Sequence, residues 1–115
     1  MEEVEIHAQS FNHVAIWVGD MRKSADWYID NLGMEEGNVS GNHIFLNLAS
    51  GQVLALFQAS DRRMIGGGVH HLALNLRPDQ KQRALDILHQ RNITLVKRGP
   101  NLSFEDRDGY WIHFS

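Results

Sequence analysis

Apolar residues occupy every second position in several short segments of the chain, a spacing typical of β-strands that bury one face. Turn-forming glycine, asparagine, serine and aspartate separate many of these segments. The segments predicted as strands are 11–18, 34–40, 43–49, 52–58, 69–76, 93–98, 101–106 and 110–115. The alternation therefore predicts a protein built largely from short strands, each with one apolar face.

Two segments instead repeat apolar residues at three- and four-residue steps, which predicts amphipathic helices. For the first helix, 21–32, Asp20 is placed as the N-cap, and Gly33 follows where a left-handed C-cap is favoured. For the second, Pro78 and Asp79 are predicted to form the first turn. Its buried face is predicted from Ala84, Leu85 and Leu88. Each half of the chain then has the order β-α-β-β-β.

The two halves are copies of one module, because a single offset superposes them at both ends. His13 and His71 are 58 positions apart, and each is followed by three apolar residues with alanine in the middle. The same offset of 58 places Gly51 on Gly109. A fixed offset without a gap indicates an internal duplication.

The predicted fold class is α+β, a single domain over residues 1–115 made of two βαβββ modules. The modules span about 11–58 and 69–115, and the glycine-rich segment 59–68 links them. Either half alone is too small to bury a stable core, so the modules are expected to share buried surface. The open strand edges of such modules also favour association, and we expect a homodimer.

Composition and charge exclude several classes of function. The formal net charge is −3 and there is no basic patch, which argues against nucleic acid as a partner. The chain has no cysteine, so disulfides and thiolate metal sites are excluded. No apolar run approaches a membrane span, and the N-terminus lacks the features of a signal peptide. A soluble, cytoplasmic protein without a membrane partner is expected.

Strand parity separates a core face from a second, mixed face. One face is apolar throughout and includes Val14, Ile16, Val18, Ile44, Leu46, Leu54, Leu56, Leu72, Leu74, Leu102, Phe104, Ile112 and Phe114. The other combines aromatic and polar side chains with small alanines, as expected for the wall of a small-molecule pocket. Its predicted substrate-binding residues are Trp17, Phe45, Asn47, Phe57, Asn75 and Trp111.

Three histidines on this mixed face, His13, His71 and His113, are predicted to bind one divalent metal ion. They lie at repeat-related strand positions, and neutral imidazole is the commonest metal ligand in proteins. A structural or surface role is the alternative for each one alone. By parity, His70 points to the opposite side. Glu105 shares the face and is the candidate general base, with a plain surface carboxylate as the alternative.

The chain resembles the vicinal oxygen chelate superfamily, which includes glyoxalase I, fosfomycin-resistance proteins, bleomycin-binding proteins and extradiol dioxygenases. The similar segments are FNHVAIWV, GVHHLALNL, ADWYIDNLGM and SFEDRDGYWIHF, over about residues 11–115. The resemblance implies two βαβββ modules in an open, cup-shaped barrel around one divalent ion, often paired across a dimer. It also implies His13 and His71 as first-strand ligands, with His113 at the terminal position that is usually glutamate.

Two departures from the family pattern limit the expected chemistry. Ala55 occupies the position of a fourth, carboxylate or glutamine ligand, and a methyl group cannot coordinate a metal. His113 gives a three-histidine set, which suits Fe²⁺, Zn²⁺, Ni²⁺, Co²⁺ or Mn²⁺ without selecting one. The expected function is a metal-dependent enzyme of the glyoxalase/dioxygenase type, either an isomerase or lyase or a ring-cleaving dioxygenase. The alternative is a metal-free, bleomycin-resistance-type protein that sequesters a drug or planar ligand.

Overall fold

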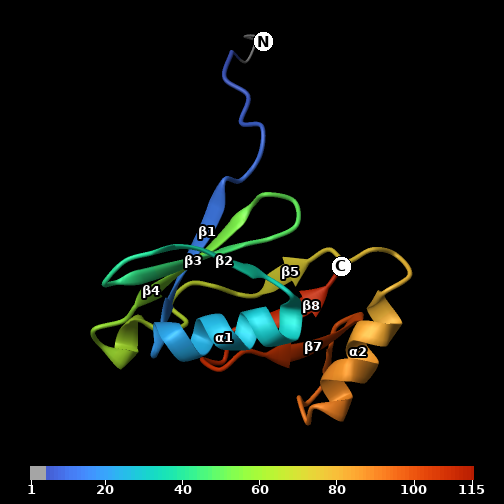
Figure 1. Cartoon of the computed structure of the whole chain (residues 1–115). Helices are drawn as coiled ribbons and strands as arrows, with labels where there is room; N and C mark the ends of the chain where they lie inside the picture. Colours follow the sequence, from blue (N-terminus) through green and yellow to red (C-terminus); the bar gives the residue numbers. More distant parts are fainter. Residues whose placement is uncertain (1–4) are drawn as a thin grey trace.

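The computed structural model describes residues 5–115 and contains two βαβββ modules (Figure 1). The elements of the first module are β1 (His13–Val18), α1 (Met21–Leu32), β2 (Glu35–Val39), β3 (His43–Asn47) and β4 (Val53–Gln58). Those of the second are β5 (Leu72–Leu74), α2 (Lys81–Gln90), β6 (Val96–Arg98), β7 (Asn101–Glu105) and β8 (Trp111–Phe114). A short 3₁₀ helix, η1 (Arg62–Met64), lies between them. The predicted α+β class is confirmed.

Each module forms its own four-stranded sheet, in the orders β1-β4-β3-β2 and β5-β8-β7-β6. The first strand of each module is parallel to the last, and the other pairs are antiparallel. Val14 pairs with Leu54 in one sheet, and Leu72 pairs with Ile112 in the other. Both members of the second pair are displaced by the predicted 58 residues, so the duplication extends to the strand register. The sheets do not close into a barrel, and β1 and β5 are edge strands.

Helix α1 begins and ends where the sequence predicts. The Asp20 side chain accepts a hydrogen bond from the Lys23 amide at 3.0 Å, and Gly33 has a φ of 67° in the left-handed region. The helix packs on the first sheet, and its Trp27 ring also lies 6.3 Å from the ring of Phe104 in the second module. Helix α1 therefore joins the two modules, as its central place in Figure 1 shows.

A single core of buried residues spans both modules. It consists of Ile16, Val18, Ala25, Tyr28, Met34, Ile44, Leu46, Leu54, Leu56, Leu85, Leu88, Phe104, Tyr110, Ile112 and Phe114. This core contains most of the predicted apolar face. Val14 and Leu102, predicted to be buried, remain exposed, and Val14 lines an open gap between β1 and β5.

Several boundaries differ from the sequence-based expectation, and β6, predicted from residue 93, begins only at Val96. Helix α2 begins at Lys81 rather than at Pro78, because residues 77–80 form a turn closed by the Gln80 amide and the Arg77 carbonyl at 2.9 Å. Strand β5 is shorter than predicted, since it pairs only with β8 over three residue pairs. Residues 5–10 extend away from the body (Figure 1), and the side chains of Ile6 and Phe11 are exposed. Among the described residues, no helix is long and apolar enough to cross a membrane.

A buried polar cluster attaches the turn before β8 to α1. The Tyr28 hydroxyl donates to Asp106 Oδ2 at 2.6 Å, while Asp106 Oδ1 accepts from the amides of Asp108 and Tyr110 at 2.8 and 2.9 Å. Ser24 Oγ donates to Asp108 Oδ2 at 2.9 Å. Burial raises the pKa of Asp106, and burial beside that carboxyl raises the pKa of Tyr28. The cluster thus positions β8 against the first module.

Asp106→Ala should lower the free energy of unfolding by about 3 kcal/mol, because it leaves the Tyr28 hydroxyl and two amides buried without an acceptor. Asp106→Asn retains an oxygen acceptor and should cost about 1 kcal/mol. Urea denaturation of both variants at neutral pH measures this difference. Equal losses would show that the retained oxygen of asparagine does not preserve the contribution, and a negligible loss in Asp106→Ala would show that the hydrogen bonds of Asp106 contribute little.

The wild type and Asp106→Asn should also differ in how the free energy of unfolding depends on pH. The raised pKa of Asp106 means that the folded protein holds a proton where the unfolded chain has lost it. The contribution of Asp106 to stability is therefore greatest below the unfolded pKa of ~4 and falls as pH rises through the folded value. Asp106→Asn cannot titrate, so its stability lacks this dependence on pH. The difference in free energy of unfolding between the wild type and Asp106→Asn should therefore shrink as pH rises from the unfolded to the folded pKa of Asp106. A constant difference would contradict the assignment.

Candidate metal and substrate site

The mixed face of the first sheet carries a continuous row of rings, which we call the first wall: His13, Trp17, His43, Phe45 and Phe57. The ring of Phe45 is stacked with those of His43 and His13, at 4.3 and 6.4 Å between centroids. Phe57 lies 6.2 Å from Phe45 and 6.0 Å from Trp17. Trp17 remains 42% exposed, so the row is open to a flat ligand.

His43 also belongs to this wall, although it was not among the site residues predicted from the sequence. Its two ring nitrogens lie 2.8 Å from Asn38 Oδ1 and Ser40 Oγ, and these contacts orient the ring against Phe45. The signal was present, since His43, Phe45 and Asn47 alternate along one strand and so share a face. Because both nitrogens already have polar partners, His43 is suited to shaping the wall.

The mixed face of the second sheet, which we call the second wall, carries His71, Arg98, Ser103, Trp111 and His113. The rings of His71 and His113 are stacked, 4.8 Å apart between centroids. Partial burial lowers the pKa of His113, and nearby His71 and Lys81 lower it further. A lowered pKa favours the neutral imidazole, which is the form that binds metals.

The prediction for His70 was wrong. Parity placed it on the side opposite His71, but His70 Nδ1 lies 2.8 Å from His71 Nδ1 and both residues line the cavity that contains His113. The reason is that β5 begins only at Leu72, so strand alternation does not extend to residues 70 and 71. His70 thus contacts a predicted ligand directly.

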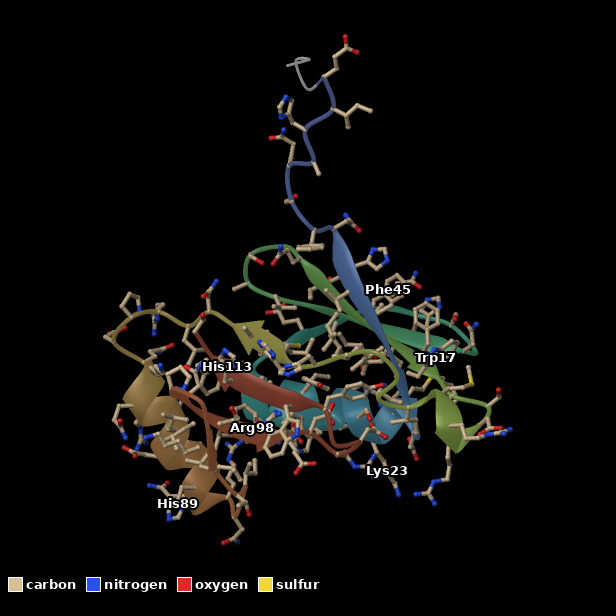
Figure 2. All side chains as sticks on the ribbon, turned by 180° about the vertical axis from the view of Figure 1, so that it is seen from behind. Trp17, Lys23, Phe45, His89, Arg98 and His113 are labelled. Carbon is tan, nitrogen blue, oxygen red and sulfur yellow. The ribbon has the colours of Figure 1, made fainter. Side chains whose placement is uncertain are left out.

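His13 stands apart from the other two predicted ligands. It lies on β1 in the first sheet, where its ring faces Phe45 and its Nδ1 is 2.9 Å from Asn12 Oδ1. In Figure 2, Phe45 and Trp17 lie away from His113. His13 and His71 do border the same mainly apolar gap of about 300 Å³ between β1 and β5. Over residues 5–115, no group of three or more potential ligands is close enough to hold a metal ion.

This arrangement fits a divalent ion only in part. His71 and His113 present two adjacent, stacked imidazoles on one wall. The usual protein site supplies at least three ligands. One chain by itself therefore offers an incomplete ligand set.

The remaining predicted residues are distributed over both walls. Glu105 is exposed and pairs with Trp111, with which it lines a hollow separate from that of His71 and His113. Asn47 and Asn75 are exposed, and Asn75 lies just beyond β5. Ala55 is fully buried and lies between Ala15 and Phe45 in the register, at the repeat position of His113. Neither of its register partners, Ala15 and Phe45, carries a carboxylate or amide group that could serve as the fourth ligand.

Comparison with known proteins identifies the fold. The family model for the Glyoxalase/Bleomycin resistance protein/Dioxygenase superfamily matches residues 10–114. A glyoxalase/dioxygenase from Nostoc punctiforme is 20% identical, with a TM-score of 0.76 and coverage of 98% of this chain and 97% of that one. An integron cassette protein from V. cholerae is 17% identical, with a TM-score of 0.79 and coverage of 96% and 97%.

The third solved structure of interest is a lactoylglutathione lyase from Agrobacterium tumefaciens, which is 16% identical. Its TM-score is 0.74, and the match covers 93% of this chain and 92% of that one. No curated protein matches the sequence. At these identities the structural likeness establishes the fold and leaves the chemistry to be argued from the walls themselves.

Proposed function

Because the chain belongs to the Glyoxalase/Bleomycin resistance protein/Dioxygenase superfamily, we propose that it is a divalent-metal-dependent enzyme acting on a small molecule. Members of this superfamily usually bind small-molecule substrates and often act as dimers. The observation that carries the proposal is the pair of adjacent imidazoles, His71 and His113, on an otherwise unexplained wall. The lowered pKa of His113 supports a ligand role at neutral pH.

The third ligand is His13 of a second copy of the chain. Within one chain His13 belongs to a different sheet from His71 and His113, and both sheets leave their first strand as an unpaired edge. The side chains of Ile6 and Phe11 are also exposed, and a second copy would cover them. A homodimer then brings the first wall of one copy to the second wall of the other, and completes two sites.

An ion held by three imidazoles would act as a Lewis acid on substrate oxygens. The protein's own residues supply the remaining functions. The rings of Trp17, Phe45 and Phe57 bind and orient the flat part of the substrate. Glu105, exposed beside Trp111 in the hollow next to that of His71 and His113, is the proposed general base for a substrate that extends across the second wall. This supports isomerase or lyase chemistry, with oxygen-dependent ring cleavage as the other route open to a three-histidine site.

Chelation of a substrate through two oxygens is testable without knowing the substrate. The Co²⁺-substituted protein should change its visible absorption spectrum when acetohydroxamate, a bidentate oxygen ligand, is added. The reason is that three protein ligands leave coordination positions open. Titration of the spectrum gives the affinity, and an excess of EDTA should abolish the signal.

His113→Ala provides the matched control, since loss of one imidazole should remove the Co²⁺ spectrum itself. A wild-type spectrum that is insensitive to acetohydroxamate would show a coordinatively saturated ion. That result would overturn the proposed chelation.

A second candidate, a metal-free binding protein, is favoured by the first wall. Its row of stacked rings can bind a planar aromatic ligand without an ion. Ala55, at the position of a fourth metal ligand, is fully buried and cannot coordinate. Binding of such a ligand that is equally tight before and after removal of divalent ions would support this alternative over the enzyme.

A further inference from the structure

Arg98, the last residue of β6, is a cation of the second wall that forms no ion pair with any acidic residue between positions 5 and 115. Its guanidinium carbon lies 4.2 Å from the centroid of the Trp111 ring. The ion pairs among residues 5–115 involve Arg22 and Arg63, and no hydrogen bond of the described chain engages the Arg98 guanidinium. A guanidinium stacked on an aromatic face keeps its N–H donors directed outward around its edge.

The strand register shows where this guanidinium lies. Asn101, Ser103 and Glu105 are successive residues on one face of β7, and they pair with Arg98, His113 and Trp111 respectively. Arg98 starts level with the first position and reaches Trp111 at the third. Its side chain must therefore pass over the middle position, where Ser103 is only 3% exposed. The small serine leaves room for this path, and Arg98, Ser103 and His113 line one cavity.

A cavity of about 490 Å³ lies at this place and has no acidic lining residue. Its polar lining comes from His70, His71, Arg98, Asn101, Ser103 and His113. In Figure 2, Arg98 and His113 lie on the same side of the molecule, and Phe45 and Trp17 lie on the other side. Hydrogen-bond donors with one fixed positive charge, and no competing carboxylate, favour an anionic guest.

We infer that Arg98 is a specificity-determining residue that binds a carboxylate of the substrate, next to the oxygen atoms presented to His71 and His113. A single planar guanidinium offers two parallel N–H donors, which match the two oxygens of a carboxylate. The substrate class is thus a small acid with a neighbouring carbonyl or hydroxyl oxygen, such as a 2-oxo or 2-hydroxy acid. This assignment builds on the proposed function for the role of the neighbouring oxygens, whereas the carboxylate contact itself needs no ion.

The experiment compares two probes of nearly the same shape, benzoylformate and its neutral amide, benzoylformamide. Binding of each is measured by calorimetry to the full-length protein as purified and after removal of divalent ions. Arg98→Ala should weaken benzoylformate by at least about tenfold in both states and leave benzoylformamide unchanged, because only the carboxylate forms a charge-assisted pair. Arg98→Lys, which keeps the charge but loses the planar fork, should fall between.

Lys97→Ala is the matched control, since it removes one positive charge from the same strand on the opposite face. It should bind both probes as the wild type does. Metal content, measured alongside, should be the same in the wild type and in Arg98→Ala.

Equal benzoylformate affinity in wild type and Arg98→Ala overturns the inference, as does failure of the wild type to bind benzoylformate at millimolar concentration. An equal loss for both probes also overturns it, because Arg98 would then act only by covering Trp111. If the purified protein holds no ion but Arg98 still discriminates the two probes, the proposed metal function fails and the carboxylate site stands.

Discussion

His71→Ala should leave the purified protein without its divalent ion, whereas the wild type should hold about one ion per chain. His71 lies in contact with His113 on the second wall, so its loss leaves a single imidazole there. Removing even an outer partner of a metal ligand costs 10–100-fold in affinity, and removal of a ligand itself should cost at least about 100-fold. Elemental analysis of protein purified without a histidine tag measures the content directly.

The choice of control follows from the structure. His70 is unsuitable because it contacts His71, and its replacement would disturb the ligand. His89 on α2 is exposed and far from His113 (Figure 2), so His89→Ala should keep its ion. Equal metal content in His71→Ala and His89→Ala, with both variants folded, would remove His71 from the site.

Mixing His13→Ala chains with His113→Ala chains should restore a metal centre that neither variant has alone. In the proposed dimer, each site takes His13 from one copy and His71 with His113 from the other. The mixed dimer then carries one intact site and one doubly defective site. With random exchange, metal content should rise from near zero to about one quarter of an ion per chain, since half of the dimers are mixed and each holds one ion.

Subunit exchange must be demonstrated independently, by native mass spectrometry after one of the two variants, which are equal in mass, has been uniformly labelled with ¹⁵N. A mixed dimer without bound metal would show that each site is built within one chain. A monomeric wild-type protein at micromolar concentration in sedimentation would also contradict the shared site.

Much of the fold follows from the sequence because the duplication constrains it twice. The offset that relates His13 to His71 also relates the observed pair Val14–Leu54 to the observed pair Leu72–Ile112. Helix α1 was predicted to the residue, since its Asp20 and Gly33 caps are local signals. Local signals and an internal repeat need no knowledge of how the modules pack.

The candidate site was predictable only in part, for reasons that depend on where strands end. Alternation correctly grouped Phe45 with Phe57, but failed for His70, because periodicity does not show where hydrogen-bonded pairing begins. Alternation also places His43 on the same face as Phe45, but it gives no reason to assign His43 to the aromatic row. Arg98 was missed because its contact with Trp111 joins residues of two strands, β6 and β8, that are not neighbours in the sheet, and such contacts depend on packing.

The hydrogen-bonded attachment between α1 and the turn before β8 makes the two halves of the gene product non-interchangeable. The repeat counterpart of Asp106 is Leu48, and that of Tyr28 is Asp86. Two first modules would set a tyrosine hydroxyl against leucine, while two second modules would oppose two carboxylates. Neither present-day half therefore carries both members of this attachment. The first module supplies the tyrosine of this hydrogen bond and the second supplies the aspartate. Genetic recombination that joined two copies of the same module would therefore produce a protein without the bond.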